Sequence, residues 1–164
     1  MKKKIVITGS PGTGKTSIID EFKKRGYSCS EEISRGIIEE QIASNGKMLP
    51  WLNLESFSQR VFSLRKVQYI NAPKNSLHFF DRGLLDVIAY MKMDALPISK
   101  HYKEDCEKYR YNTTVFYTPI WEEIYINDSE RKESIESAIT IEKSLLETYK
   151  LFGYTLIEIP KLTI

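Results

Sequence analysis

Short apolar runs alternate along this chain with longer segments in which apolar residues recur at every third or fourth position. The runs predict β-strands at residues 5–8, 27–30, 77–80, 113–117 and 154–159. The periodic segments predict helices at residues 15–25, 31–43, 57–70, 84–91, 99–109 and 134–152. Glycine, asparagine and proline stand at several boundaries, and Gly153 is expected to cap the last helix.

Strands that alternate with helices predict a parallel sheet with helices on both faces. Ligands bind beyond the carboxyl ends of the strands in such sheets, so the residues that follow each strand are the first candidates for a functional site. The apolar residues expected to face the core are Ile33, Ile37, Ile38 and Ile42 in the second helix, Phe57, Val61, Leu64, Val67 and Ile70 in the third, and Ile135, Ile139, Leu146 and Tyr149 in the last.

The composition narrows the class of protein without naming a function. The chain has 164 residues, of which 41% are hydrophobic and 28% charged, and this is expected to form one domain over residues 1–164. These values exclude a disordered chain and a collagen-like one, and the length is too short for a TIM barrel. The net charge of +2, with no basic stripe interleaved with aromatic residues, gives no support for nucleic-acid binding.

The same sequence predicts a cytoplasmic protein without a membrane segment. No apolar run approaches the length that spans a bilayer, and the run that follows the lysines at the start is too short for a signal peptide. The two cysteines, Cys29 and Cys106, have no metal-ligand spacing and are expected to be reduced. The oligomeric state is left open, a homodimer included.

The most specific signal is a phosphate-binding loop between the first strand and the first helix. The pattern G-x-x-x-x-G-K-[ST] is complete in Gly9, Ser10, Pro11, Gly12, Thr13, Gly14, Lys15 and Thr16, and Ser17 follows it. Glycines allow the backbone to wrap around phosphates, and the start of the helix offers its positive end to the same anion. Lys15 is expected to reach the β- and γ-phosphates of ATP, and the Thr16 hydroxyl to ligate Mg²⁺.

A carboxylate and an arginine follow the third strand. The run Leu77 to Phe80 ends at Asp81, which is typical of a Walker B strand whose carboxylate holds Mg²⁺ or its water. Arg82 comes next and suits a phosphate or an acceptor oxygen. The alternative for Arg82 is a surface ion pair.

Charged residues also follow the second and fourth strands. Glu32 could accept a proton from an acceptor hydroxyl, or it could be an acidic residue of the first helical turn that the helix dipole favours. Arg35 lies three residues on and therefore on the same helix face. Arg131, in the charged stretch after the fourth strand, is expected to close over the γ-phosphate, the alternative being a solvated loop.

Together these patterns resemble a family of small bacterial P-loop proteins described as AAA-type ATPase domains or predicted ATPases. The family is similar in turn to the ribosylnicotinamide kinase domain of the bacterial NAD regulator, and more distantly to thymidylate and deoxynucleoside kinases. The resemblance covers nearly the whole chain. It is carried by the phosphate loop, Glu32-x-x-Arg35, Phe80-Asp81-Arg82-Gly83 with Asp86 and Tyr90 behind it, Asn127-Asp128-x-Glu130-Arg131, Tyr149-x-x-x-Gly153-Tyr154 and Ile157-x-Ile159-Pro160.

The resemblance implies a three-layer α/β fold of the nucleoside/nucleotide-kinase type, with a five-stranded parallel sheet in the order 2-3-1-4-5. It implies that Asp81 and Arg82 match the Asp-Arg element of those kinases and that Arg131 matches their lid arginine. Relatives usually continue past the last strand into a further short helix, whereas only residues 161–164 remain here, so an edge of the fold is expected to be trimmed.

Three functions remain open at this point. The first is a kinase that moves the ATP γ-phosphate to a hydroxyl of a small, nucleoside-like molecule, with Lys15, Asp81, Arg82 and Arg131 around the phosphates, Glu32 as base, and Glu32, Arg35, Arg82 and Tyr90 at the acceptor. The second is a nucleoside monophosphate kinase, which needs arginines rather than a base. The third is a nucleotide-binding regulatory ATPase with a protein partner. The absence of an N-K-x-D motif argues against a Ras-like GTPase.

Overall fold

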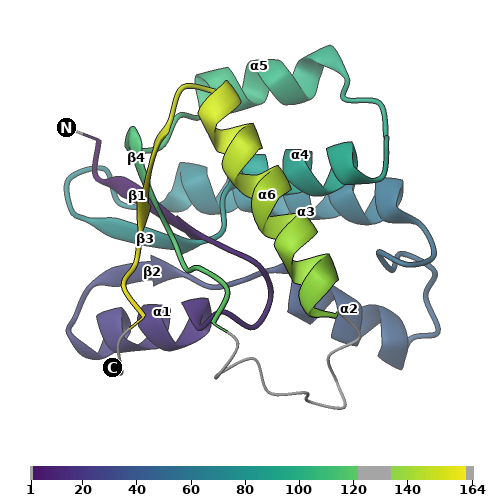
Figure 1. Cartoon of the computed structure of the whole chain (residues 1–164), viewed down its shortest axis with the longest axis horizontal. Helices are drawn as coiled ribbons and strands as arrows, with labels where there is room; N and C mark the ends of the chain where they lie inside the picture. Colours follow the sequence, from purple (N-terminus) through teal and green to yellow (C-terminus); the bar gives the residue numbers. More distant parts are fainter. Residues whose placement is uncertain (1, 122–133, 162–164) are drawn as a thin grey trace.

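The fold is taken from a computed structural model, which describes residues 2–121 and 134–161. Along the chain the elements are β1 Lys4–Thr8, α1 Lys15–Lys24, β2 Ser28–Ser30, α2 Ser34–Ala43, α3 Leu54–Asn71, β3 His78–Asp81, α4 Leu84–Met93, α5 Lys100–Lys108, β4 Thr114–Tyr117, α6 Ile135–Leu151 and β5 Thr155–Glu158. Figure 1 shows them in sequence colours.

The strands form one parallel sheet in the order β2-β3-β1-β4-β5, which confirms the fold class expected from the sequence. In this order β1 lies between β3 and β4, so the loop after β1 is adjacent to the ends of both neighbours. The register pairs Ile7 with Asp81 and Thr8 with Tyr117. The phosphate loop and Asp81 therefore lie side by side at the carboxyl ends of the central strands.

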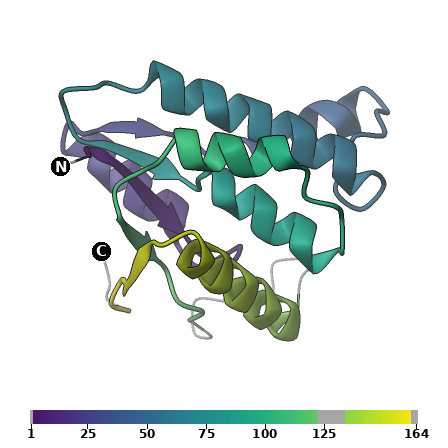
Figure 2. The ribbon, with the colours of Figure 1, turned by 90° about the horizontal axis from the view of Figure 1, so that it is seen from above.

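Alternate residues of the central strands face two different hydrophobic layers. Ile7 of β1 and Phe79 of β3 pack with Ile19 of α1 on one face. Val6 and Phe80, one position along, face the larger cluster that α3, α4, α5 and α6 supply. In Figure 2, α4 lies between α3 and α6. Because helices cover both faces of the sheet, the central strands are continuous apolar runs and do not alternate between apolar and polar residues.

Most predicted elements are found within a few residues of their expected bounds, and α2 is the clearest exception at a helix start. The sequence places this start at Glu31, whereas the helix begins at Ser34. The Glu32 carboxylate accepts hydrogen bonds from the backbone N–H groups of Ser34 and Arg35, each at 3.0 Å. Glu32 thus lies before the helix and satisfies two of its first amides.

Two of the expected helix faces are wrong in part. Val67 and Ile70 of α3 are 50% and 52% exposed, while Ser58 and Arg65 are buried in their place. Ile42 at the end of α2 is likewise exposed. Each helix carries more apolar residues than one face can bury, so the neighbouring helices rather than the periodicity select the buried side.

The buried face of α6 also differs in part from the expected one, although Tyr149 is fully buried as expected. Ile135 and Ile139 are exposed, whereas Ala138, Ile141 and Leu145 are buried. The small side chain of Ala138 lets α6 approach the phosphate loop, and its backbone carbonyl accepts a hydrogen bond from Ser10 Oγ at 2.5 Å. Close approach to this loop therefore fixes the rotation of α6.

The end of α6 and the absence of a long apolar helix in the described residues both bear on expectations from the sequence. Gly153 has φ +84°, as expected for the residue that caps α6. Within residues 2–121 and 134–161, no helix is long and apolar enough to cross a membrane.

Alanine substitutions on α6 test which face is buried. Leu145→Ala is expected to lower the free energy of unfolding by about 2–5 kcal/mol, because it opens a cavity at a fully buried position. Ile139→Ala, on the face that the sequence wrongly assigns to the core, is expected to change it by less than about 0.5 kcal/mol. Urea denaturation of both variants measures the difference, and equal losses would contradict the observed rotation of α6.

Candidate functional site

The phosphate loop joins β1 to α1 through glycines in conformations that other residues rarely adopt. Gly9, Gly12 and Gly14 have φ of +143°, +75° and +90°. At Gly9 a Cβ atom would also lie 2.4 Å from Thr118 Oγ1 and 2.6 Å from the Thr118 carbonyl oxygen. The glycine at the start of the pattern is thus required both for its backbone angle and for its contact with the end of β4.

Lys15 folds back over this loop at the start of α1. Its side chain is buried, and its ammonium group donates to the Ser10 carbonyl at 2.7 Å and to Thr13 Oγ1 at 3.4 Å. Burial, together with the nearby Arg82 guanidinium, lowers the pKa of Lys15 to about 7. An anion in the loop would favour the charged form of this lysine, as expected for a phosphate-binding group.

Thr16 and Asp81 are the two residues that the sequence predicts as ligands of a magnesium ion. Thr16 is exposed at the first turn of α1. Asp81 ends β3, is 2% exposed, and its Oδ1 atom has no hydrogen-bond partner among the described residues. Burial raises the pKa of Asp81, while the charges of Lys15 and Arg82 oppose that shift. A buried carboxylate oxygen without a partner fits a site that a cation or its bound water completes.

Arg82 follows Asp81 in a strained backbone conformation, with φ +73°. Its buried guanidinium donates from Nη1 to Asp86 Oδ1 at 3.1 Å and lies 5.9 Å from the centre of the Tyr90 ring. Burial opposes its charge, but Tyr90, Asp86 and Glu32 outweigh burial and raise the pKa of Arg82 above its ordinary value. The alternative of a surface ion pair is thus wrong as to the surface, since the pair is buried, and the expected contact with a phosphate stays a prediction.

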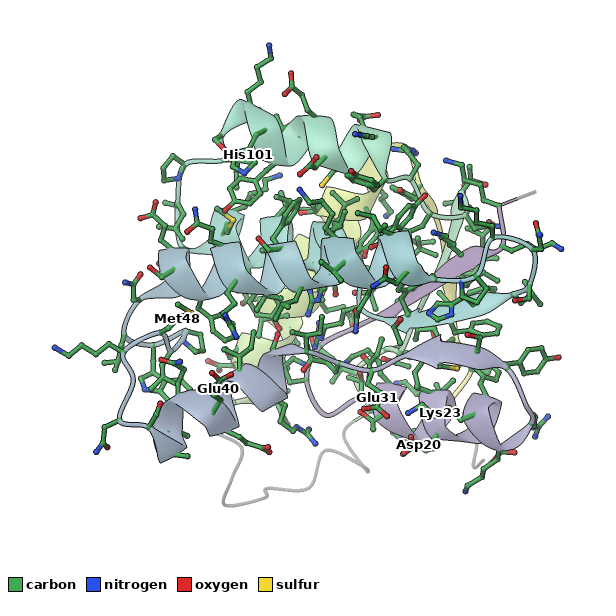
Figure 3. The ribbon with its side chains drawn as sticks, turned by 180° about the vertical axis from the view of Figure 1, so that it is seen from behind. Asp20, Lys23, Glu31, Glu40, Met48 and His101 are labelled. Carbon is green, nitrogen blue, oxygen red and sulfur yellow. The ribbon has the colours of Figure 1, made fainter. Side chains whose placement is uncertain are left out.

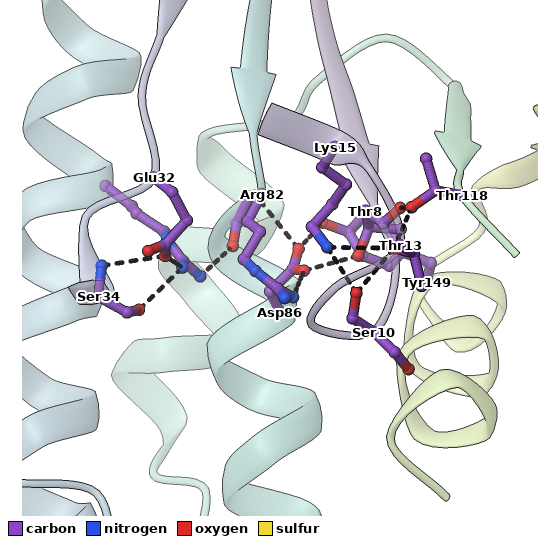
Figure 4. A network of polar contacts seen from close by, with 12 residues as sticks. Thr8, Ser10, Thr13, Lys15, Glu32, Ser34, Arg82, Asp86, Thr118 and Tyr149 are labelled. Atoms are coloured by element: carbon purple, nitrogen blue, oxygen red, sulfur yellow. Dashed lines mark hydrogen bonds and ion pairs between the residues drawn. The ribbon is translucent and has the colours of Figure 1, made fainter. Parts of the chain in front are cut away.

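Asp86 is the centre of a buried hydrogen-bond network (Figure 4). Besides Arg82, its carboxylate accepts from Thr8 Oγ1 at 2.6 Å, from the Gly83 N–H at 2.9 Å and from the Tyr149 hydroxyl at 2.5 Å. Two donors on each carboxylate oxygen use its whole acceptor capacity. The network joins β1, the turn after β3, α4 and α6, and the sequence assigned no role to Asp86 beyond its place in the family pattern.

Glu32 lies between β2 and α2, on the far side of Arg82 from the phosphate loop in Figure 4. Its Oε1 atom accepts from Ser34 N–H at 3.0 Å and from Arg65 Nη2 at 2.9 Å, and its Oε2 atom accepts from Arg35 N–H at 3.0 Å. Burial alone would raise the pKa of Glu32, but the charges of Arg65 and Arg82 and the two amides lower it to about 2. Glu32 therefore lies just before α2 and not in its first turn, and its role as a base stays a prediction.

Arg65 is a residue that sequence reasoning missed. It lies on α3, is 3% exposed, and donates to Glu32 and to the Gly83 carbonyl. The signal that could have found it is an arginine four residues after Val61, where the buried stripe of the helix continues.

The remaining predicted site residues make fewer described contacts with Glu32 and Arg82. Arg35 is exposed at the start of α2, and only its backbone N–H contacts Glu32 among the contacts described here. Tyr90 is half-buried beside Arg82. Arg131 lies outside the described residues, so its expected position over the phosphates stays a prediction.

The Tyr149 hydroxyl is expected to stabilise the network around Asp86. Tyr149→Phe should lower the free energy of unfolding by about 1–3 kcal/mol, because it removes one donor from a fully buried carboxylate. Tyr117→Phe is the matched control, since the Tyr117 hydroxyl bonds Glu158 at the surface, and its effect is expected to stay within about 0.5 kcal/mol. Equal effects in urea denaturation would contradict the network.

Glu32 is expected to make the stability depend on acid pH. Its pKa is about 2 in the fold against 4.5 ordinarily, so its ionised form stabilises the fold above pH 4.5 by about 3 kcal/mol, and this contribution is lost as the pH falls toward 2. Glu32→Gln should therefore be less stable than the wild type at pH 7, and the gap should narrow toward pH 3. A gap that is independent of pH in urea denaturation would contradict the shifted pKa.

Solved structures of kinases share this fold. Deoxyadenosine kinase from M. mycoides with bound dATP superposes with a TM-score of 0.64 at 23% identity, over 99% of this chain and 93% of that one. Thymidylate kinase from Ehrlichia chaffeensis gives a TM-score of 0.62 at 12% identity, over 99% of this chain and 91% of that one. The NadR protein in complex with NR gives 0.67 at 22% identity, over 96% of this chain and 45% of that one.

At these identities the likeness shows the fold alone, which is that of nucleoside and nucleotide kinases. No curated protein sequence matches the chain at a significant level. A family model described as an AAA domain matches residues 4–164, nearly the whole length. The chain therefore belongs to this family of AAA-domain P-loop proteins.

Proposed function

We propose that the protein binds Mg-ATP and transfers the γ-phosphoryl group to a hydroxyl of a small, nucleoside-like molecule. The phosphate loop with its buried Lys15 supports a nucleoside triphosphate as the donor. The kinase fold, in which Glu32 follows the strand next to that of Asp81, supports an acceptor on the α2–α3 side of the site.

The observation that favours a hydroxyl over a phosphate as the acceptor is that both buried arginines are paired with carboxylates. Arg65 is neutralised by Glu32 at 2.9 Å and Arg82 by Asp86 at 3.1 Å. A nucleoside monophosphate brings two further negative charges, and within the described residues these two buried arginines already have carboxylate partners. A neutral hydroxyl instead needs an ionised carboxylate nearby, and Glu32 is one.

The proposed roles follow from the state of each side chain. Glu32, with a pKa of about 2, is ionised at neutral pH and orients the acceptor hydroxyl by accepting its hydrogen bond. The hydroxyl oxygen forms a bond to the γ-phosphorus, the bond from that phosphorus to the β–γ bridging oxygen breaks, and ADP leaves. The hydroxyl proton passes to Glu32 as the new bond forms and then to water. A base this weak takes the proton late, which suits a loose transition state.

Lys15 neutralises charge on the phosphates, Arg82 lies beside them with its own charge balanced by Asp86, and Thr16 and Asp81 would hold Mg²⁺. When bound, the ion would neutralise charge that develops on the phosphate oxygens. In the part of the chain that the structure describes, no group of three His, Cys, Asp or Glu side chains could hold a metal. The proposed ion would therefore take some of its ligands from the nucleotide.

ADP release from Mg-ATP, measured with and without a panel of nucleosides, nucleoside monophosphates and ribosylated vitamins, tests the proposal. One hydroxyl acceptor is expected to stimulate release. Glu32→Gln is expected to lower the stimulated kcat on the order of 10²- to 10⁴-fold, because the variant side chain cannot take the proton, and to leave ATP binding unchanged.

Glu31→Gln is the matched control for this variant. Glu31 is exposed, and it pairs with Lys23 of α1, which also contacts Asp20 (Figure 3). The control is expected to stay within about twofold of the wild type. Stimulation by monophosphates that survives Glu32→Gln would indicate a nucleoside monophosphate kinase instead. Lys15-dependent hydrolysis that no acceptor stimulates would indicate a regulatory ATPase.

A further inference from the structure

Arg65 is a charged side chain at a position where α3 otherwise buries Phe57, Val61 and Phe62. Its side chain is 3% exposed, and its Nε atom has no hydrogen-bond partner among the described residues. Burying a guanidinium with one N–H unsatisfied costs free energy, so the contacts that its other nitrogens make must offset that cost.

Those contacts join three segments that are distant in the sequence. Nη1 of Arg65 donates to the Gly83 carbonyl at 3.1 Å, and Nη2 donates to Glu32 Oε1 at 2.9 Å and lies 3.4 Å from Ser34 Oγ. One rigid guanidinium therefore connects the end of β2 with the turn after β3. Gly83 is the residue directly after Arg82. The Arg65 guanidinium, whose nitrogens form a rigid fork, therefore fixes the Glu32 carboxylate relative to the backbone next to Arg82.

The two oxygens of Glu32 are used unequally. Oε1 accepts from Arg65 and from Ser34 N–H, which fills both of its lone pairs. Oε2 accepts only from Arg35 N–H among the described contacts, so one lone pair remains. The Glu32 side chain is 22% exposed, so a ligand can reach part of it.

We propose that Arg65 is a positioning residue, which rests on the proposed function of Glu32. Arg65 holds Oε1 so that Oε2 faces the acceptor hydroxyl, at a fixed place relative to Arg82 at the transferring phosphoryl group. Arg65 does not itself contact the acceptor, because it is buried and both of its terminal nitrogens already donate to protein oxygens.

A titration of the Glu32 carboxyl tests this without any need for activity. In protein labelled with ¹³C at glutamate Cδ, Glu32 is identified by the signal that Glu32→Gln lacks. Its pKa is about 2 in the wild type, and Arg65→Gln is expected to raise it by one unit or more, because the nearest cation is lost. The charges that remain nearby are Arg82, Lys15 and Asp81, all unchanged in the variant.

Arg60→Gln is the matched control, since Arg60 lies on the same helix and pairs with Glu40 at the surface. It is expected to leave the Glu32 titration unchanged. An unchanged titration in Arg65→Gln would overturn the proposal. If Arg65→Gln does not fold, the kinetic comparison below is made with Arg65→Lys, because a lysine keeps the charge but its single ammonium cannot span Glu32 and Gly83 as the fork does.

Kinetics then separate positioning from a structural role. With an acceptor that the wild type phosphorylates, Arg65→Gln is expected to lower kcat about 10- to 100-fold, as a misplaced catalytic group does, with unchanged ATP affinity. In the Glu32→Gln background the same substitution is expected to cause no further loss, since its only route is through Glu32. Additive losses would overturn the proposal. Arg65→Lys is expected to be intermediate, and wild-type kcat in that variant would overturn the need for the fork.

The outcomes distinguish the two proposals. If no acceptor is phosphorylated, or if Glu32→Gln leaves transfer unchanged, the proposed function fails, yet the titration still reports whether Arg65 holds the Glu32 carboxylate. If transfer depends on Glu32 but not on Arg65, the proposed function stands and the positioning role is wrong.

Discussion

A fully buried carboxylate, that of Asp86, connects the segments from which the candidate site is built. It accepts hydrogen bonds from Thr8 at the end of β1, from Arg82 and Gly83 after β3, and from Tyr149 on α6. A buried carboxylate with fewer donors would carry a large desolvation cost, so these four groups are held together. The strained backbone of Arg82 and the approach of α6 to the phosphate loop both depend on this requirement.

Charge balance at the carboxyl edge of the sheet follows from the same constraint. Arg82 pairs with Asp86 and Arg65 with Glu32, and each pair is buried at hydrogen-bond distance. Lys15 and Asp81 are less well compensated, since burial shifts the pKa of each toward its neutral form. An anionic phosphate would stabilise the charged form of Lys15, and a cation would stabilise the charged form of Asp81. The electrostatics therefore support a nucleotide with its metal at this point, and an uncharged group on the side of Glu32.

Much of this arrangement could be predicted from the sequence. The strand order and the phosphate loop follow from the family resemblance and from a motif of high specificity, and the loop's glycines have the backbone angles that the motif requires. The place of Arg65 four residues after Val61 could have indicated its burial, but its partners could not be predicted, because nothing in its sequence neighbours indicates that α3 places it against Glu32 and Gly83. The assignment of Ile139 to the buried face of α6 was wrong for a similar reason, since the contact that buries Ala138 instead is with the distant phosphate loop.

Local sequence patterns were enough to predict the order of the elements, the phosphate loop, and the places of Asp81, Arg82 and Glu32 at or just after the ends of their strands. These are local properties, set by apolar periodicity, by glycines and by the place where each strand ends. Only the tertiary structure decided which charges pair, which helix faces are buried and how ionised each group is. Those depend on distances between segments far apart in the chain and on the loss of water around them, neither of which a local pattern contains.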